Sequence, residues 1–375
     1  MIPGYPKETF FVPDGIYLLS HSVGCLPVST EKHLSDSFFR PWANSGGHAW
    51  TNWLDNINAF TQALAQLFNS NAQNFCPQVN LSSALTKILF SLPTPTHRNK
   101  VVFSARDFPS IGTVLQKYCK TLELEPVMIP QDRNLADPQT WSDFLDEEVS
   151  IALITHVVSN TGQKLPIRDI VQLCRDRTIT SIVDIAQSAG IIPVDLSHWQ
   201  ADFVIGSCVK WLCGGPGAGY LWVSDNNIHE CQPDDIGWFS HKDPMSLTMN
   251  NFEYAPDARR FTGGTPSVIP FTLATESIKL MHSAGIEHIH SHNKKLLSRL
   301  ASQLNVNSPC QPNERGGTFV VSFSNNQKAL QTLTSAGVHC DLRSEGLRLS
   351  PHLYNSASDI DTLAELINPL LGKRR

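Results

Sequence analysis

The feature that most constrains the fold is a regular alternation of apolar and amphipathic segments between residues 101 and 223. Apolar runs alternate with segments whose apolar positions recur at helical spacing, such as IRDIVQLCRDR at Ile167–Arg177. The expected strands are Val101–Ala105, Ile151–Val158, Ser181–Ala186, Ala201–Ser207 and Gly219–Val223. Strand–helix–strand order with short links predicts an α/β fold, in which helices cover both faces of a mostly parallel sheet.

A smaller α+β domain is expected after this sheet. Pro266–His292 is expected to form one long helix that leads away from it. The remaining expected elements are strands at Thr318–Ser324 and Leu347–Leu349, and helices at Gln327–Ala336 and Ile360–Leu371. We therefore predict a large domain at residues 14–260 and a small domain at residues 261–375, which also includes the N-terminal segment 1–13.

Composition disfavours several classes of protein. Hydrophobic residues make up 41% of the 375 residues and charged residues 17%, which supports a sizeable core and excludes global disorder. The net charge of -5 disfavours a nucleic-acid binder, which normally carries a basic excess. No apolar run approaches the roughly 18 residues of a membrane span, and MIPGYPKETF lacks an apolar signal segment. Nine scattered cysteines without a CxxC pair fit free thiols, so we expect a cytoplasmic protein.

Two charged side chains near the ends of expected strands carry the most chemical information, because ligands of such sheets bind beyond the carboxyl ends of the strands. Lys210 lies in the apolar run FVIGSCVKWL. It either emerges into water or is a desolvated amine of lowered pKa that forms a Schiff base. Asp184 follows the strand SIV. It is a surface charge, a helix cap, or the partner of a protonated heterocyclic nitrogen.

Two loop motifs have both a structural and a functional interpretation. The run GGPGAG, which begins at Gly214, is better interpreted as a tight turn than as a phosphate loop, because no GK[ST] follows and no helix begins there. The run NLSSALT precedes an expected helix at Lys87–Leu92. It provides an ordinary N-cap through Asn80 or Ser82, an anion site, or both.

Arg348 lies inside an apolar segment, LRLSPHLYN, and therefore needs a partner. Its planar fork suits a substrate carboxylate, and the structural alternative is an internal salt bridge to Asp341 or Glu345. His288 and His292 share a helix face, but no carboxylate or cysteine completes a site, so we expect no metal.

Several ordered motifs together resemble a known family. The chain resembles the fold-type I pyridoxal-phosphate enzymes of the class V aminotransferase group, and within it kynureninase, from about Ile16 to Asp361. The most specific motifs are VDIAQSAGIIPVDL, ADFVIGSCVKWLCGGPGAGYLWV, GWFSH, RRFTGGTPS and GLRLSPHLYN. The resemblance implies a large domain that binds pyridoxal 5'-phosphate, a smaller α+β C-terminal domain, and a homodimer with active sites at its interface.

The resemblance also implies roles for individual residues. Lys210 resembles the Schiff-base lysine and proton shuttle, and Asp184 the partner of the pyridine nitrogen. The other implied cofactor-binding residues are Leu81 and Ser82 at the phosphate, Phe108 stacked on the ring, Thr155, Gln187 near the phenolic oxygen, and Trp238 and Thr265 at the phosphate, with Thr265 from a neighbouring subunit. The implied substrate-binding residues are Arg348, for the α-carboxylate, and His48.

The sequence departs from the kynureninase pattern at three positions. Val209 replaces a tyrosine, Ile111 an aspartate, and Gln187 the usual histidine. Cys340 lies only eight residues before Arg348 (348 minus 340), in GVHCDLR. That segment is similar to the kynureninase and epimerase pattern, and the spacing disfavours a desulfurase.

We therefore expect an enzyme that uses pyridoxal phosphate on a free α-amino acid, with kynureninase-like hydrolysis of a Cβ–Cγ bond as the first hypothesis. Lys210 would remove the Cα proton, while the ring protonated through Asp184 absorbs the charge. The alternatives within the class are an epimerase, a β-lyase and an aminotransferase. A second hypothesis is a non-catalytic binding protein on the same scaffold. A third, a nucleotide-binding α/β protein, lacks the glycine fingerprint near Ala105 or Thr155.

Overall fold

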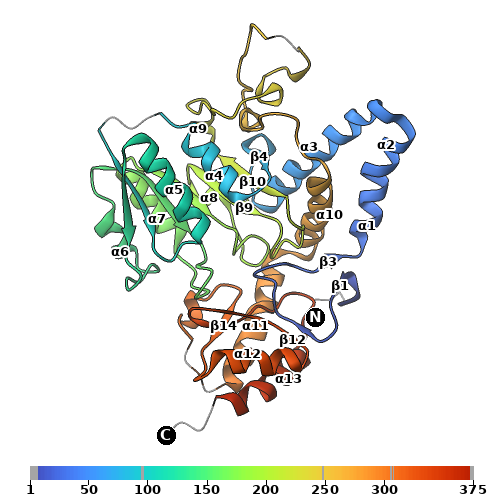
Figure 1. Ribbon diagram of the computed structural model, residues 1–375, viewed down its shortest axis with the longest axis vertical. Coiled ribbons are helices and arrows are strands. Elements are labelled where there is room, and N and C mark those ends of the chain that lie inside the picture. The colour runs from blue at the N-terminus through green and yellow to red at the C-terminus, as the bar shows by residue number, and fades with distance from the viewer. Residues whose placement is uncertain (1–6, 94–96, 247–248, 305, 307, 372–375) are drawn as a thin grey trace.

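A seven-stranded sheet organises the computed structural model, which describes residues 7–93, 97–246, 249–304, 306 and 308–371 (Figure 1). In sheet order the strands are β4 (Phe75–Gln78), β10 (Gly219–Val223), β9 (Phe203–Ser207), β8 (Thr180–Asp184), β7 (Val149–Thr155), β5 (Lys100–Ser104) and β6 (Glu125–Ile129). β10 is antiparallel to both neighbours, and the pairs from β9 to β6 are parallel. The predicted α/β class with a mostly parallel sheet is confirmed.

Sequence periodicity finds the interior strands of this sheet but misses its two edges. The five expected strands are β5, β7, β8, β9 and β10, within a few residues at each end. The missed strands β4 and β6 are the outermost two, and they contain Pro77 and Pro126. Proline cannot donate to a strand ladder and is tolerated at sheet edges, so these segments lack the usual strand signal.

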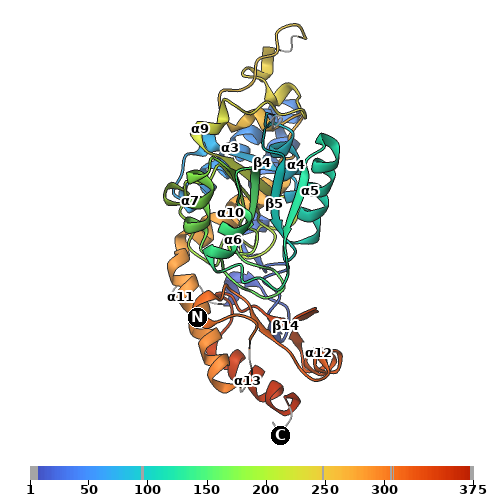
Figure 2. The same cartoon turned by 90° about the vertical axis from the view of Figure 1, so that its left-hand side faces the viewer.

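Helices cover both faces of the sheet, because alternate residues of each strand point to opposite sides. One apolar core lies between the sheet and α3 (Trp50–Leu67), α7 (Ile167–Asp176) and α10 (Ile269–Ala284). The other lies under α4 (Leu81–Leu89) and α5 (Pro109–Leu122). Figure 2 shows the sheet between α7 on one side and α5 on the other.

The expected long helix at Pro266–His292 is wrong, because the chain forms two helices that meet at Gly285. α10 ends at Ala284, Gly285 has φ +78°, and α11 spans Ile286–Gln303. Glycine adopts such a φ without strain and commonly ends helices. α10 packs against α3, whereas α11 runs down to the C-terminal part of the chain (Figure 2).

The C-terminal part surrounds a separate apolar core. Its sheet has the order β11 (Phe319–Val321), β14 (Gly346–Leu349) and β13 (Asp341–Arg343), with helices α12 (Asn326–Ser335) and α13 (Ala357–Ile367). Residues 16–17, which the prediction placed in the large domain, join it, because β2 (Ile16–Tyr17) pairs in parallel with β12 (Val338–His339). The division at residue 260 stays a prediction, and residues 1–6 and 372–375 of the predicted small domain lie outside the described residues.

The remaining strands and α-helices are short. They are β1 (Phe10–Phe11), β3 (Leu26–Pro27), α1 (Ser29–Leu34), α2 (Arg40–Ser45), α6 (Pro138–Phe144), α8 (Leu196–Trp199) and α9 (Asp225–Ile228). β1 and β3 pair in a sheet of their own. α1 and α2 form an arm that projects beside α3 in Figure 1.

Candidate active site

Four of the predicted site residues lie at the carboxyl edge of the sheet. Thr155 and Asp184 are the last residues of β7 and β8 and are register partners. Lys210 follows β9, and its Nζ lies 5.8 Å from the centre of the Phe108 ring, which precedes α5. The edge therefore brings together the amine, the carboxylate and the aromatic ring that the sequence indicates.

The loop between β9 and β10 fixes the position of Lys210. The Lys210 carbonyl accepts a hydrogen bond from the Cys213 N–H at 2.9 Å. The Val209 carbonyl accepts one from the Gly24 N–H at 2.9 Å. A Cβ atom at Gly24 would lie 2.2 Å from the Lys210 carbonyl oxygen, so the N-terminal segment passes directly against the loop. Burial lowers the pKa of the Lys210 amine, although Asp184 partly offsets this.

Asp184 is a buried carboxylate whose pKa the charge of Lys210 influences. Its Oδ1 accepts a hydrogen bond from the Ala186 N–H at 2.8 Å. Burial raises the pKa of Asp184, and the Ala186 N–H and Lys210 oppose that rise. Among ion pairs within 4.0 Å in the described parts of the chain, none joins Asp184 to Lys210. An amine and a carboxylate without a direct ion pair at one edge of the sheet fit a ring that binds the amine at its aldehyde carbon and the carboxylate at its cationic nitrogen.

Sequence reasoning missed a second carboxylate at this edge, Asp107. Its Oδ1 accepts the Thr155 hydroxyl hydrogen at 2.6 Å, and its Oδ2 accepts the Ser104 N–H at 2.7 Å. Burial raises the pKa of Asp107 to about 7, and the charge of Asp184 adds to the rise. The available signal was its position, because Asp107 follows a buried strand as Asp184 does.

Gln187 lies beside Asp184 and is held by two other residues. Its Nε2 donates to the His21 carbonyl at 3.0 Å, and its Oε1 accepts from Trp211 Nε1 at 3.1 Å. One hydrogen on Nε2 remains for another acceptor, because a side-chain amide carries two. The side chain is therefore oriented before any ligand arrives.

Leu81 and Ser82 are the first two residues of α4, which begins well before the expected Lys87–Leu92 helix. Asn80 is the N-cap, and its Oδ1 accepts from the Ser83 N–H at 2.8 Å. The cap is therefore confirmed, and the other first-turn N–H groups at this helix start suit an anion.

The glycine run after Lys210 is a turn. Gly215 has φ +71° and Gly217 φ +88°, values that favour glycine. The turn leads directly into β10, as the tight-turn interpretation predicts.

Arg348 lies on β14, almost fully buried, and forms the predicted internal salt bridge to Asp341. Nε and Nη2 both donate to that carboxylate, and Nη1 donates to the Ser159 carbonyl at 3.0 Å. A guanidinium has five N–H donors, so these bonds leave one hydrogen on each terminal nitrogen. Two adjacent buried donors suit a ligand carboxylate, so the structural and functional interpretations are compatible.

Three predicted site residues lie elsewhere. Trp238 donates from Nε1 to the hydroxyl of the exposed Thr265 at 3.2 Å, and its ring meets Trp50 edge-on at 6.1 Å. His48 is exposed on a short 3-10 helix between α2 and α3. Among the contacts of the described residues, none joins these three side chains to Lys210.

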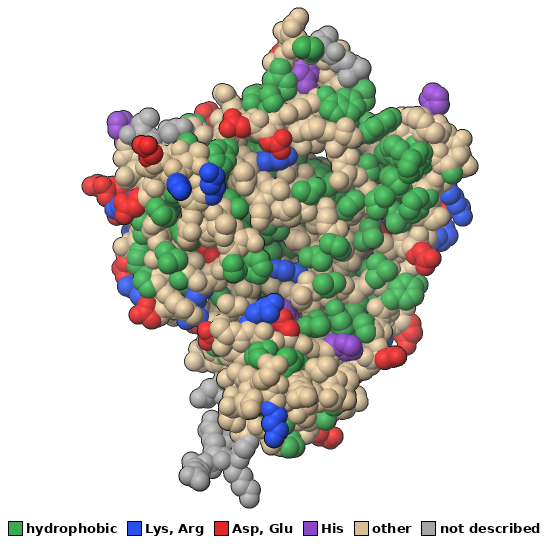
Figure 3. Space-filling model, viewed as in Figure 1, with side chains coloured by type: hydrophobic (Ala, Val, Ile, Leu, Met, Phe, Trp, Pro, Cys, Tyr) green, Lys and Arg blue, Asp and Glu red, His purple; other side chains and the backbone are tan. Residues whose placement is uncertain are grey.

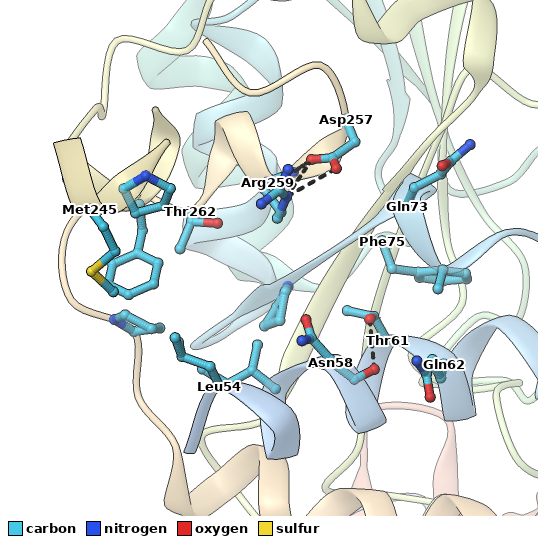
Figure 4. A pocket seen from close by; sticks show the side chains of 16 residues that line it. Leu54, Asn58, Thr61, Gln62, Gln73, Phe75, Met245, Asp257, Arg259 and Thr262 are labelled. Atoms are coloured by element: carbon cyan, nitrogen blue, oxygen red, sulfur yellow. Dashed lines mark hydrogen bonds and ion pairs between the residues drawn. The ribbon is translucent and has the colours of Figure 1, made fainter. Parts of the chain in front are cut away.

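A separate cavity of about 450 Å³ lies between α3, β4 and the segment at 239–266 (Figure 4). On one side Arg259 donates from Nε to both oxygens of Asp257, at 2.9 Å each. None of the predicted site residues lines this cavity, although Phe239 and Pro266, which do, adjoin Trp238 and Thr265. It is therefore distinct from the Lys210 site.

Two of the three histidines of α11, His290 and His292, are bound to backbone carbonyls. His290 donates from Nδ1 to Ile191 at 3.0 Å, and His292 from Nε2 to Asn355 at 2.9 Å. Within the described residues, no group of three or more His, Cys, Asp or Glu side chains is placed to hold a metal ion. Within the same residues, no helix has the length and apolar character to cross a membrane.

Comparison with known proteins decides the family. The family model described as aminotransferase class-V matches residues 55–363. The chain belongs to this family. A class V aminotransferase-family protein is an enzyme dependent on pyridoxal phosphate, so the predicted cofactor is confirmed.

Individual relatives of this class V protein include kynureninases. The kynureninase of Deinococcus radiodurans is 27% identical over 90% of this chain and 85% of its own, and that of Burkholderia mallei is 26% identical over 90% and 84%. The uncharacterized aminotransferase YcbU of Bacillus subtilis is 25% identical over 83% of each chain.

Solved structures confirm the fold-type I architecture. A mutant of C-DES with glycine covalently linked to its PLP cofactor has a TM-score of 0.88 at 19% identity and covers 98% of this chain and 100% of its own. The apo cysteine desulfurase of Thermococcus onnurineus has a TM-score of 0.88 at 17% identity and covers 99% and 98%.

Proposed function

We propose that this class V enzyme acts on a free α-amino acid at the Lys210 site, with kynureninase-like hydrolysis of a Cβ–Cγ bond as the first reaction. The observation that carries the proposal is the half-buried Lys210 amine and the buried Asp184 carboxylate at the same edge of the sheet, where each shifts the pKa of the other. When bound there, pyridoxal phosphate supplies an electron sink that makes the Cα proton of an amino acid acidic.

Each side chain around this position has a separate role in this proposal. The lowered pKa of Lys210 favours the neutral amine, which is the form that accepts a proton. Asp184 holds a proton on the ring nitrogen through its charge. Phe108 offers an exposed ring face, and the first turn of α4, at Leu81 and Ser82, offers N–H groups for the phosphate. Gln187 completes the set near the phenolic oxygen, and Thr155 approaches the cofactor.

Arg348 binds the α-carboxylate of the substrate in this proposal. Its guanidinium is fixed by Asp341 and the Ser159 carbonyl, and it keeps one free N–H on each terminal nitrogen. A carboxylate takes two parallel hydrogen bonds from such an edge. The arginine is oriented in advance, which reduces the entropy lost on binding.

The kynureninase-like reaction is supported by the two kynureninase relatives, whose matches cover 85% and 84% of their own chains. Val209, Ile111 and Gln187 differ from the kynureninase pattern, so an epimerase, a β-lyase and an aminotransferase are the rival outcomes at the same site. Desulfurase chemistry needs a thiolate, but burial raises the pKa of Cys340 to about 12. That thiol is therefore protonated at neutral pH.

The test uses protein loaded with pyridoxal phosphate. We expect a yellow holoprotein that loses its visible band in Lys210→Ala and keeps it in Lys164→Ala, because Lys164 is another lysine whose pKa burial lowers. L-Kynurenine should give anthranilate and alanine without added keto acid. Pyruvate from a β-substituted alanine together with no kynurenine turnover would replace the hydrolase with a lyase. A colourless protein would favour the non-catalytic binding alternative.

A homodimer completes the site in this proposal. Thr265 reaches the cofactor phosphate of a second copy, Trp238, which donates to Thr265, reaches the phosphate too, and His48 lines the substrate pocket. Exposed aromatic residues, Phe39 at 49% and Trp42 at 53%, lie on the nearby arm, and Figure 3 shows hydrophobic side chains gathered over that region. Trp42→Asp should lower the molar mass measured by light scattering. Met128→Asp, on the edge strand β6, should leave it unchanged.

A cytoplasmic location is also proposed. All nine cysteines are free thiols, and eight of them are buried, which suits a reducing compartment. Cell fractionation of a tagged protein tests this location.

A further inference from the structure

His21 connects Asp341, in the C-terminal part of the chain, with Gln187, which follows β8 of the large sheet. The ring is buried, with Nε2 2.9 Å from Asp341 Oδ1 and Nδ1 2.7 Å from Ser350 Oγ. Its own carbonyl accepts from Gln187 Nε2 at 3.0 Å. One residue of the N-terminal segment therefore contacts both the partner of Arg348 and the amide beside Asp184.

The hydrogen bonds fix the tautomer of this ring. Asp341 is ionised, because bonds from His21 and Arg348 outweigh burial and bring the pKa of Asp341 well below its ordinary value. An ionised carboxylate is an acceptor, so Nε2 of His21 carries the hydrogen. Burial lowers the pKa of His21 to about 4, so the ring is neutral and Nδ1 accepts from the Ser350 hydroxyl. Thr318 then donates to Ser350 at 2.8 Å.

The neutral ring also sets the charge at this end of the site. Asp341 carries one negative charge and meets two guanidinium groups, that of Arg348 and, at 3.5 Å, that of Arg343. The local sum is one positive charge, which favours an incoming anion. A donor from His21 fixes Asp341 without adding charge, and Asp341 in turn holds two of the five N–H groups of Arg348.

We propose that His21 is a positioning residue that sets the angle of the Arg348 fork through Asp341 and ties it to Gln187 on the cofactor side. The inference rests on the proposed function, because it assumes that Arg348 receives the carboxylate of an amino acid. The essential contact is the Nε2 hydrogen bond to Asp341, because Asp341 also binds Arg348, whereas the Nδ1 bond goes to Ser350, which in turn binds Thr318.

Two substitutions separate the two ring nitrogens. His21→Gln keeps an amide nitrogen at about the reach of Nε2, and His21→Asn keeps a polar atom at about the reach of Nδ1. The probes are L-alanine and ethylamine, which differ by the carboxylate. Each is titrated into holoprotein, and the change in the visible band of the bound cofactor gives its half-saturation concentration.

We expect His21→Asn to raise the L-alanine concentration at half-saturation about tenfold and to leave that of ethylamine within twofold. His21→Gln should stay within about threefold of the wild type for both probes. Ser350→Ala removes the hydrogen bond to His21 Nδ1, and its half-saturation concentrations should also stay near those of the wild type. Asp341→Asn should raise the half-saturation concentration of L-alanine at least as much as His21→Asn. This variant tests the same contact if His21→Asn does not fold.

Three results would overturn the inference. They are an unchanged L-alanine response in His21→Asn, an equal loss for both probes, and a His21→Gln variant as weak as His21→Asn. A wild-type protein that does not bind pyridoxal phosphate, or that does not favour L-alanine over ethylamine, would overturn the proposed function and this inference with it. A wild type that favours L-alanine, combined with an unaffected His21→Asn, overturns this inference alone.

Discussion

Thr155 donates its hydroxyl hydrogen to Asp107 across 2.6 Å, and this bond joins the carboxyl ends of the neighbouring strands β7 and β5. Asp107 thereby shares a buried region with Asp184, whose charge raises the pKa of Asp107. Two acids in one such region resist simultaneous ionisation. A cationic ring nitrogen beside Asp184 relieves that repulsion, so both acids favour the protonated form of a bound pyridine ring.

Asp107 gives the apoprotein a distinctive pH dependence. Burial raises its folded pKa from 3.8 to about 7, so the folded state keeps a proton that the unfolded chain releases. The contribution of Asp107 to stability is therefore present below the unfolded pKa and is lost as pH rises through about 7. The free energy of unfolding of wild type relative to Asp107→Asn should fall by about 2 kcal/mol between pH 5 and pH 8 in urea titrations. An unchanged difference would contradict this.

Gly24 is predicted to be essential for the position of Lys210. In Gly24→Ala the new Cβ would lie 2.2 Å from the Lys210 carbonyl oxygen and 2.6 Å from Cys213 Sγ, so the loop must move. We expect the free energy of unfolding to fall by about 2 kcal/mol and the visible band to be weaker after loading with cofactor. Gly47→Ala is the control, because no atom lies within 4 Å of its new Cβ. Similar melting temperatures and spectra for both variants would refute the prediction.

The junction between α10 and α11 needs glycine. Gly285 has φ +78°, and a Cβ there would also lie 3.2 Å from His288 Nδ1. Gly285→Ala should lower the free energy of unfolding by about 1–2 kcal/mol. Gly112→Ala, inside α5 with ordinary space for a methyl group, should instead stabilise by about 0.5–1 kcal/mol. Chemical denaturation measures the free energy of unfolding of both variants. A change in the same direction for both would contradict the prediction.

Asp341 stabilises the fold because it neutralises buried Arg348. Asp341→Asn should cost about 3 kcal/mol, since it leaves that charge without its partner. The folded pKa of Asp341 lies below the unfolded one, so its contribution is present above pH 4 and is lost as pH falls further. Asp361→Asn removes a similar but exposed pair with Arg299 and should have a much smaller effect in urea titrations. A comparable fall in the free energy of unfolding of the two variants would contradict the prediction, because it would mean that burial does not strengthen the Asp341–Arg348 pair.

The sequence predicts the interior of the fold well because burial on both faces leaves a strong apolar signal. The five interior strands have that signal, and the two proline-containing edge strands do not. The expected helix at Pro266–His292 fails for a related reason. Its apolar positions continue through Gly285, and periodicity alone does not detect a single residue of positive φ.

The candidate site is predictable where a charge interrupts an apolar run. Lys210, Asp184 and Arg348 were found in this way, and the structure buries Asp184 and Arg348 and half-buries Lys210. His21 was missed because its partner Asp341 lies 320 residues away, and local pattern does not reveal such a contact. Asp107 was missed although it adjoins Phe108, because a short polar residue after a strand is usually part of a turn.

The pairing of Ile16 with Val338 determines when the site can be completed during synthesis. The strands of the large sheet lie between Phe75 and Val223, so the ribosome delivers them as one continuous stretch. The N-terminal segment emerges first and can bond Val209 and Gln187 through Gly24 and His21, but Ile16 and the His21 Nε2 have no partner until Val338 and Asp341 leave the exit tunnel. A nascent chain that stops before residue 338 can therefore contain the whole sheet and Lys210, yet it lacks the means to recognise a carboxylate.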